Sequence, residues 1–403
     1  MNQVPRISED WIITGVGLLL VAIPFVQPLP APAFQWMPAP GLVPVAFLVQ
    51  GGIALGGWIC VALLTGRAWR VSVVSFMAVW AAGQVALWCA GTAWARALGL
   101  EAVVFSLVIG LALGQVMPMP AAWRPVVSSE LWVKIGLVML GASVIFSDLM
   151  KAGALGLIQA SVVVVVVWYV AFRIARFFRL DEELQMMIAS AVSICGISAA
   201  IATAGAIRGD ARKLSMVVSM VLVVALPMML GMPFLAEYLR LSPAVTGAWL
   251  GGTIDTTGAV VAAGALAGEE ALKTSTIVKF SQNVLLGVAA FGISIYWAYR
   301  QHDQTAPRPT LGVIWHRFPK FVIGFLAASL GYTLLVAPAE LSIVKDGVKS
   351  MQTLWFVMAF VAIGLETNLR ELMQQQNRKA LYAFLLAQIF NILLTLMISY
   401  LLF

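Results

Sequence analysis

The chain has 403 residues, of which 61% are hydrophobic and 11% are charged. Soluble domains carry roughly 25% charged residues, so the composition excludes an ordinary soluble domain and predicts an all-α polytopic membrane protein. The net charge of +7 is spread over short loops, so it reflects membrane topology and does not indicate a nucleic-acid partner. Cys60, Cys89 and Cys195 lie within apolar segments, and we expect no disulfide.

Apolar runs of bilayer-spanning length recur along the chain and predict about 11 transmembrane helices. The first is interpreted as a retained helix, because a proline-rich stretch follows it in place of a signal-peptide cleavage site. The predicted ranges are 11–27, 42–65, 71–94, 102–117, 131–148, 153–176, 213–238, 271–299, 319–336, 350–369 and 379–402.

We expect three consecutive regions along the chain. Residues 1–100 form N-terminal accessory helices with few polar residues. Residues 101–300 contain the first repeat and two Gly-rich interrupted segments, and residues 301–403 complete the second repeat.

The two interrupted segments, 183–207 and 244–267, resemble diverged copies of one another. Superimposed at a constant offset of 59, they place Gly205 on Gly264. Paired interrupted hydrophobic segments are the best sequence pointer to the substrate site of a secondary transporter. The alternative is that both are ordinary packing helices with small-residue contacts.

Loop charges indicate how these two segments meet the membrane. If both cross it, the best orientation leaves 15 Lys and Arg in cytoplasmic loops and 8 outside. If each segment returns to the side it entered from, the counts become 17 and 6. The second arrangement predicts a cytoplasmic N-terminus, with 208–213 cytoplasmic and 268–273 external. Each segment and its following helix then form one half of an inverted repeat, and a weaker likeness between 141–150 and 364–373 fits the same inversion.

Polar residues of the two segments predict a binding site. Unwound backbone within a membrane is tolerated only where it is buried in protein or lines a cavity, and half-helix N-termini there favour an anion. For any single hydroxyl, a hydrogen bond to its own helix is the alternative. The candidate substrate-binding residues are Ser193, Cys195, Gly196, Ser198, Thr203, Thr253, Thr256, Thr257, Gly258, Gln282 and Asn283.

Asp255 and Lys279 are ionisable residues within these membrane segments, where such groups indicate function. Asp255 is expected either to carry a coupling Na⁺ or H⁺ or to form a static charge pair with Lys279. Lys134 and Glu366 lie nearer helix ends, where we expect them to snorkel. We expect no metal, other cofactor or catalytic site, because His302 and His316 are isolated in one loop.

At these segments the chain resembles the YeiH-like sulfate exporter family. The matching motifs are Ser193-Ile-Cys-Gly196, the stretch 251–264 ending Val-Val-Ala-Ala-Gly, Ile277-Val-Lys279, Gly110-Leu-Ala-Leu-Gly114 and Gly364-Leu-Glu-Thr367. The resemblance covers about residues 100 to 403, and it extends to the wider group of sodium/proton antiporters and bile acid symporters. It implies a transport domain that slides against a scaffold domain, usually in a homodimer in the bacterial cytoplasmic (inner) membrane.

One departure from that family concerns the site itself. Where the family reads Thr-Val-His-Glu, this chain has Thr253-Ile-Asp-Thr256, and Gln282 replaces a following arginine. This favours a divergent branch with its own ligand.

The leading interpretation is an elevator-type secondary transporter of a small anion, such as sulfate, sulfite or an organosulfonate. Its site would lie between segments 193–203 and 253–264. The alternatives are a Na⁺- or H⁺-coupled importer of an organic acid, an anion channel, and an intramembrane enzyme.

Overall fold

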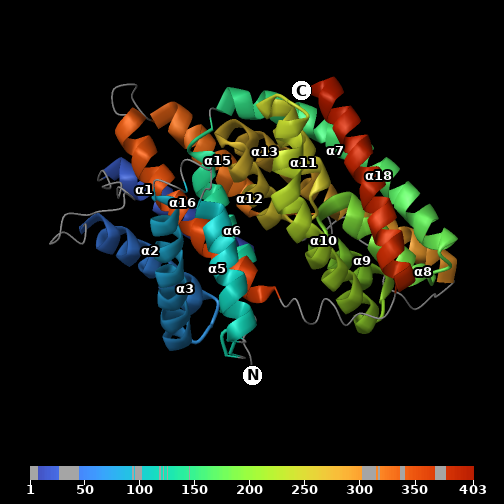
Figure 1. Cartoon of the computed structure of the whole chain (residues 1–403), viewed down its shortest axis with the longest axis horizontal. Helices are drawn as coiled ribbons and strands as arrows, with labels where there is room; N and C mark the ends of the chain where they lie inside the picture. The colour runs from blue at the N-terminus through green and yellow to red at the C-terminus, as the bar shows by residue number, and fades with distance from the viewer. Residues whose placement is uncertain are drawn as a thin grey trace. The chain divides into compact units, whose positions relative to one another are not determined.

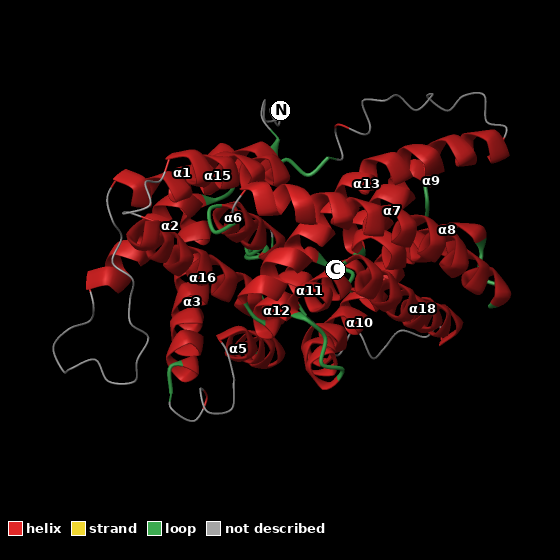
Figure 2. Cartoon of the chain, turned by 90° about the horizontal axis from the view of Figure 1, so that it is seen from above, coloured by secondary structure: helices red, strands yellow, loops and turns green. Residues whose placement is uncertain are grey.

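The computed structural model describes residues 8–26, 45–92, 95, 102–117, 119–120, 122–124, 126–144, 146–301, 315, 318–335, 341–367 and 378–403. Within them every regular element is a helix, with no strand (Figure 2). Seven of these helices are long and apolar enough to cross a bilayer, so the predicted all-α membrane fold is confirmed at this level. Among the described residues a helix lies within each predicted range, and that each one crosses the membrane stays a prediction.

The chain divides into two compact units, each built from two separate stretches. Unit 1 combines Met1–Asp148 with Lys320–Asn368, and unit 2 combines Leu149–Pro319 with Leu369–Phe403. The units therefore do not follow the three consecutive regions expected from the sequence. The N-terminal helices belong to the same unit as two C-terminal ones.

Unit 1 is a bundle in which aromatic side chains join the N-terminal helices to the rest. Trp58 packs edge-on against Trp132 at 5.3 Å between ring centroids, and Phe76 lies between Trp132 and Trp355. All four side chains are fully buried. The helices of unit 1 (Figure 1) are α1 (Glu9–Val26), α2 (Val45–Leu64), α3 (Trp69–Ala90), α5 (Ala102–Val116), α6 (Ser129–Gly141), α15 (Phe321–Leu335) and α16 (Leu341–Glu366).

Helices α6 and α16 run antiparallel through the middle of unit 1. Glu366, at the end of α16, accepts hydrogen bonds from the backbone N and Oγ of Ser129 at 2.9 and 2.6 Å, and so caps the start of α6. Glu366 therefore acts as a helix cap between elements, a role that snorkelling does not describe.

Lys134 also differs from the expectation that it snorkels. Its ammonium lies 2.9 Å from Asp10 of α1 and 2.8 Å from Glu130 one turn earlier. The side chain is mostly buried, at 14% exposure, so its partners lie inside unit 1. An acidic residue of the N-terminal helix makes this possible, and only the folded unit brings it there.

The predicted helix 131–148 is wrong at its C-terminal end. The helix stops at Gly141, a turn follows, and α7 (Phe146–Phe177) begins five residues later. Gly141 packs directly on the backbone carbonyl of Phe325 in α15. Ser329 then donates to the carbonyl of Val144 at 2.7 Å, which holds the turn. Contacts between distant elements therefore end this helix, within a run of residues that is apolar throughout.

Unit 2 contains α7 from Leu149 onward and both interrupted segments. Its other elements are α8 (Glu182–Ser190), the π-helical turn η1 (Ala191–Cys195), α9 (Ile197–Ile207), α10 (Ala211–Tyr238), α11 (Pro243–Thr253), α12 (Thr257–Ala267), α13 (Glu269–Gln301) and α18 (Arg378–Leu402). Local caps define where several of them start. The side chains of Asp181, Asp210, Ser242 and Thr256 each accept a backbone N–H at the helix that follows.

The first interrupted segment, α8 to α9, is a hairpin. Lys213, just after the segment, lies 2.7 Å from Asp181 and 3.1 Å from Glu183, which precede and begin it. The backbone N of Asp210 also donates to Glu183. Because α8 and α9 pack side by side, the chain enters and leaves at one level.

The first arm of the second hairpin, α11, runs parallel to α13. Gly247 packs against Ala271, and Gly251 packs against the backbone of Ser275 four residues further along. At Gly251 the carbonyl of Ser275 occupies the space that a Cβ would need, so only glycine allows this approach.

The second arm, α12, runs back along α13 in the opposite direction. Thr257, at its start, accepts a hydrogen bond from Asn283 at 3.2 Å, and Gly264, near its end, packs against Leu272. Both ends of this hairpin therefore lie near the start of α13, while its tip lies beside the middle of that helix. Figure 1 shows α11 and α12 next to α13.

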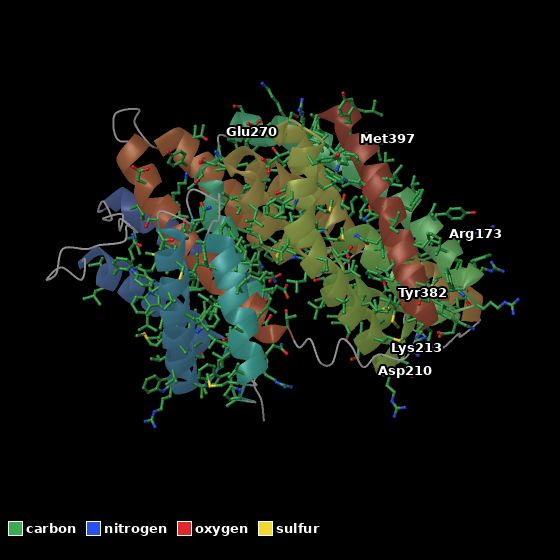
Figure 3. All side chains as sticks on the ribbon, viewed as in Figure 1. Arg173, Asp210, Lys213, Glu270, Tyr382 and Met397 are labelled. Carbon is green, nitrogen blue, oxygen red and sulfur yellow. The ribbon has the colours of Figure 1, made fainter. Side chains whose placement is uncertain are left out.

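The two hairpins point in opposite directions along α13. The start of α9 packs toward Leu285, Leu286 and Ala289, on the C-terminal side of the tip. In Figure 3, Glu270 lies at one end of this unit, while Asp210 and Lys213 lie at the other. Hydropathy alone does not show whether the two interrupted segments continue in one direction or turn back. Within unit 2 both segments turn back on themselves.

Candidate functional site

The tips of the two hairpins meet beside Lys279, about a third of the way along α13. Lys279 is ten residues past the start of α13, and Val221, which touches the tip residue Gly196, is ten residues past the start of α10. Ten helical residues rise about 15 Å, which is half of a hydrocarbon core about 30 Å thick. The tips also touch each other, because a Cβ on Gly196 would lie 3.1 Å from that of Asp255.

The break in the first segment depends on glycine. Gly196 has φ 59° and ψ −110°, a backbone conformation that side-chain-bearing residues rarely adopt. The π-helical turn before it shifts the hydrogen-bond register by one residue, so the backbone N of Gly196 donates to the carbonyl of Ala191. In the second segment, Ile254 to Thr256 leave the helix without any positive φ.

The second arms of the two hairpins are equivalent, with one correction to the alignment. Helices α9 and α12 are both 11 residues long, and their bounds differ by 60, where the sequence alignment used 59. The shift pairs Ser193 with Thr253 and Ile194 with Ile254. The offset of 60 therefore holds on both sides of the break.

Lys279 joins both tips. Its ammonium donates to the carbonyls of Ile194 and Ile254, at 2.8 Å each, and to Oε1 of Gln282 at 3.0 Å. The residue is 1% exposed. The two carbonyls come from equivalent positions of the two hairpins, at the C-terminal ends of their first arms, where the helix dipole is negative.

The other carbonyls at these C-terminal ends are bound by amide side chains. Gln282 donates to the carbonyl of Gly252 at 3.0 Å. From α18, Gln388 and Asn391 donate to the carbonyl of Thr253, at 2.9 and 3.3 Å, and Asn391 also reaches Val192. Unwound backbone at this depth is thus satisfied by protein groups, as a membrane interior requires.

The N-terminal ends of the second arms are partly accessible, and the start of α12 carries the Thr256 cap. The first N–H groups of a helix have no acceptor within it. Ile197 and Ser198 of α9 are partly exposed, as are Thr256 to Gly258 around the start of α12, while the C-terminal ends are buried. Hydroxyl groups and positive dipole ends are therefore the accessible part of the tips.

Several buried oxygen atoms at the tips have no hydrogen-bond partner among the described residues. They are Ser193 Oγ, Thr253 Oγ1, both carboxylate oxygens of Asp255, Asn283 Oδ1 and Gln388 Oε1. Ser193 and Thr253 are equivalent positions of the two hairpins. Buried polar groups in proteins normally have partners, so this group of oxygens indicates a binding site.

Asp255 and Lys279 are both fully buried and close enough to interact electrostatically. They form no ion pair within 4.0 Å among the described residues, because the ammonium is directed at the backbone carbonyls. A direct static pair is therefore not the geometry found. Gln388 is the other polar side chain beside the Asp255 carboxylate.

Most of the predicted site residues gather at the tips, and two do not reach the accessible turns. Cys195 is buried in η1, close enough to Lys279 to interact with it electrostatically. Thr203 is buried further along the arm of α9. Both stay predictions as ligand-binding residues. His302 and His316 lie outside the described residues.

Sequence reasoning missed three amide side chains that hold the tips together: Gln159 of α7, Gln388 and Asn391. Gln159 donates to the carbonyl of Ala248 at 2.8 Å. The available signal was the occurrence of uncharged polar residues within otherwise apolar helices. That signal identifies polar side chains that need a hydrogen-bond partner, but it does not show which backbone group each one would bind.

The sequence profile of the family described as "Conserved hypothetical protein 698" matches residues 74–383, a range that contains both hairpins and α13. A UPF0324 membrane protein of Rhodopirellula baltica is 36% identical over 352 residues, which cover 84% of this chain and 64% of that protein. A second, from Nitratidesulfovibrio vulgaris, is 36% identical over 343 residues, covering 82% and 59%. A third, from Pseudomonas aeruginosa, is 27% identical over 314 residues, covering 75% and 86%.

The matched region spans about three fifths of the length of the first two relatives. No solved structure matches this chain. The relatives are named as membrane proteins, in agreement with the apolar helices of this structure. The chain therefore belongs to the membrane-protein family described as conserved hypothetical protein 698.

Proposed function

We propose that this protein is a secondary active transporter of a small anion, with its site at the tips of the two hairpins. The observation that carries the proposal is the meeting of two oppositely directed hairpins at Lys279. Interrupted helices that meet at mid-membrane in an inverted arrangement are a recurring basis of substrate binding and alternating access.

The different chemistry of the two helix ends supports an anion as substrate. The negative C-terminal ends are already occupied by an ammonium and by amide groups of the chain. The positive N-terminal ends of α9 and α12 are accessible, and Ser198 and Thr257 add hydroxyl donors. Sulfate, sulfite and organosulfonates are oxyanions that accept several hydrogen bonds. The resemblance to YeiH-like exporters at these segments points to the same class.

The division into two units supports an elevator mechanism. Unit 2 holds the whole candidate site, and the chain passes between the units only three times. We propose that unit 2 is the transport domain and that unit 1, built around antiparallel α6 and α16, is the scaffold. The proposed assembly is a homodimer in the bacterial inner membrane, with a cytoplasmic N-terminus.

The unpartnered carboxylate of Asp255 supports coupling to Na⁺ or H⁺. A carboxylate at the hairpin tips would bind the coupling ion close to the substrate, so that the two move together. An ion bound at Asp255 could be coupled to the transport of an organic acid as well as of an oxyanion. The same carboxylate therefore also favours the second candidate function, a Na⁺- or H⁺-coupled importer of an organic acid.

Counterflow in proteoliposomes tests the proposal. Vesicles loaded with unlabelled sulfate, sulfite or methanesulfonate should transiently accumulate the same radiolabelled anion from outside. With the membrane potential clamped by K⁺ and valinomycin, a channel produces no such accumulation, because it does not couple the efflux of one anion to the influx of another. Absence of flux for all three oxyanions, together with counterflow of an organic acid such as citrate, would replace the first candidate by the second.

A further inference from the structure

The oxygen atoms around the Lys279 ammonium form a cation site. Three neutral oxygens surround Nζ at 2.8, 2.8 and 3.0 Å, and two of them are backbone carbonyls. Neutral carbonyl oxygens are ligands that hard cations accept in proteins. The three hydrogen-bond acceptors of this buried ammonium are all uncharged, and the Asp255 carboxylate interacts with it electrostatically without a direct ion pair within 4.0 Å among the described residues.

The position of these oxygens explains why a cation is needed. The carbonyls of Ile194 and Ile254 end two helical arms that point at each other from opposite sides of the unit. Each arm carries partial negative charge at this end. Without a positive group between them, two negative ends would face each other in a buried site.

We propose that this is a cation site filled by the chain's own Lys279, and that it accepts a free monovalent cation once the lysine side chain is removed. This inference rests on the proposed function. In it, the ammonium of Lys279 holds the two hairpins together, while the exchangeable coupling ion binds at Asp255. Neither Na⁺ nor K⁺ is then required at the Lys279 position of the unaltered protein.

Thermal stability of the full-length protein in detergent tests this, without any transport measurement. Lys279→Ala is compared in choline, sodium, potassium and methylammonium chloride at equal ionic strength. We expect it to be much less stable than the unaltered protein in choline, and to gain about 5 °C or more in Na⁺ or methylammonium. Lys279→Met is the control, because its side chain fills the space and leaves no room for an ion, so it should show no such gain.

Two outcomes overturn the proposal. One is a folded Lys279→Ala protein whose stability is the same in all four salts. The other applies even if that variant cannot be isolated: Lys279→Arg, which keeps the charge, should be more stable than Lys279→Met, and equal stability of the two refutes a need for a cation. Failure of the proposed function would appear separately, as absent counterflow in a protein whose cation response is as expected.

Discussion

One ammonium group gives the two ends of each interrupted helix different roles. Lys279 occupies the carbonyl ends of the first arms, and thereby leaves the N–H ends of the second arms as the groups that can bind a ligand. We therefore expect the same residue to influence both the stability of the tips and the sign of the charge of the ligand that they bind. Substitutions at the tips should separate these two effects.

Ser198→Ala and Thr257→Ala should each weaken anion binding. Losing a hydrogen bond to a charged group costs about 1.5–3 kcal/mol, which is roughly ten- to a hundredfold in affinity. Titration calorimetry with sulfate, sulfite and methanesulfonate measures the change. Ser219→Ala is the control, because that hydroxyl bonds to its own helix at Ser215. If affinity is unchanged in both tip variants, these hydroxyls only contribute to packing.

Asp255→Asn should preserve the fold and anion binding but abolish the response of uptake to a Na⁺ or proton gradient. The change removes the charge but keeps the shape of a side chain that forms no direct ion pair within 4.0 Å among the described residues, so we expect the fold to be kept. Gradient-driven uptake in proteoliposomes is the measurement. A variant that is still driven by the same gradient would exclude Asp255 as the coupling group.

The alternative is that Asp255 has a purely structural role, which would be seen in measurements of stability. If it served only to neutralise Lys279, Asp255→Asn would cost about 3–5 kcal/mol in stability, and the double variant with Lys279→Met would recover it. The absence of a direct pair within 4.0 Å among the described residues leads us to expect no recovery.

At the scale of elements, the hairpins depend on how each segment is interrupted. Gly196→Ala should destabilise the protein by about 2–6 kcal/mol, because alanine is strained at φ 59° and its Cβ would lie 2.7 Å from Val221. Denaturation followed by tryptophan fluorescence measures this. Gly231→Ala in α10 is the control, since nothing lies within 4 Å of its added Cβ. Equal effects of the two changes would contradict the proposed strain.

Much of this element-level arrangement was predictable from the sequence. Apolar runs located the helices, and small residues with hydroxyls located the two interrupted segments, because lipid allows few polar groups that are not functional. The end of α6 at Gly141 was not predictable, since it depends on a contact with Phe325 in a distant helix.

The partners of the buried polar side chains were not predictable either. Asn391 and Lys279 meet carbonyls far away in the chain, and no local pattern specifies which carbonyl that is. The candidate residues could be named from the sequence, but the distinction between bound C-terminal ends and accessible N-terminal ends required the folded hairpins.

For the whole molecule, the opposed hairpins predict which loops share a side of the membrane. Arg212→Cys and Glu270→Cys, both at exposed positions, should react with an impermeant thiol reagent from opposite sides. The background should lack Cys60, Cys89 and Cys195. Labelling in intact cells and in inverted vesicles gives the answer, with residue 212 expected to be cytoplasmic from the loop charges. Reaction of both cysteines from one side would refute the opposed arrangement.

The order in which the ribosome makes the hairpins has a consequence for membrane insertion. The first hairpin ends at Ile207, 72 residues before Lys279 (279 − 207), and at 5–20 residues per second that interval lasts about 4–14 s. During that time the carbonyl of Ile194 lacks its ammonium, and lipid offers no substitute. We therefore expect the nascent hairpin to wait at the membrane surface and to reach its final depth only once α13 has been synthesised.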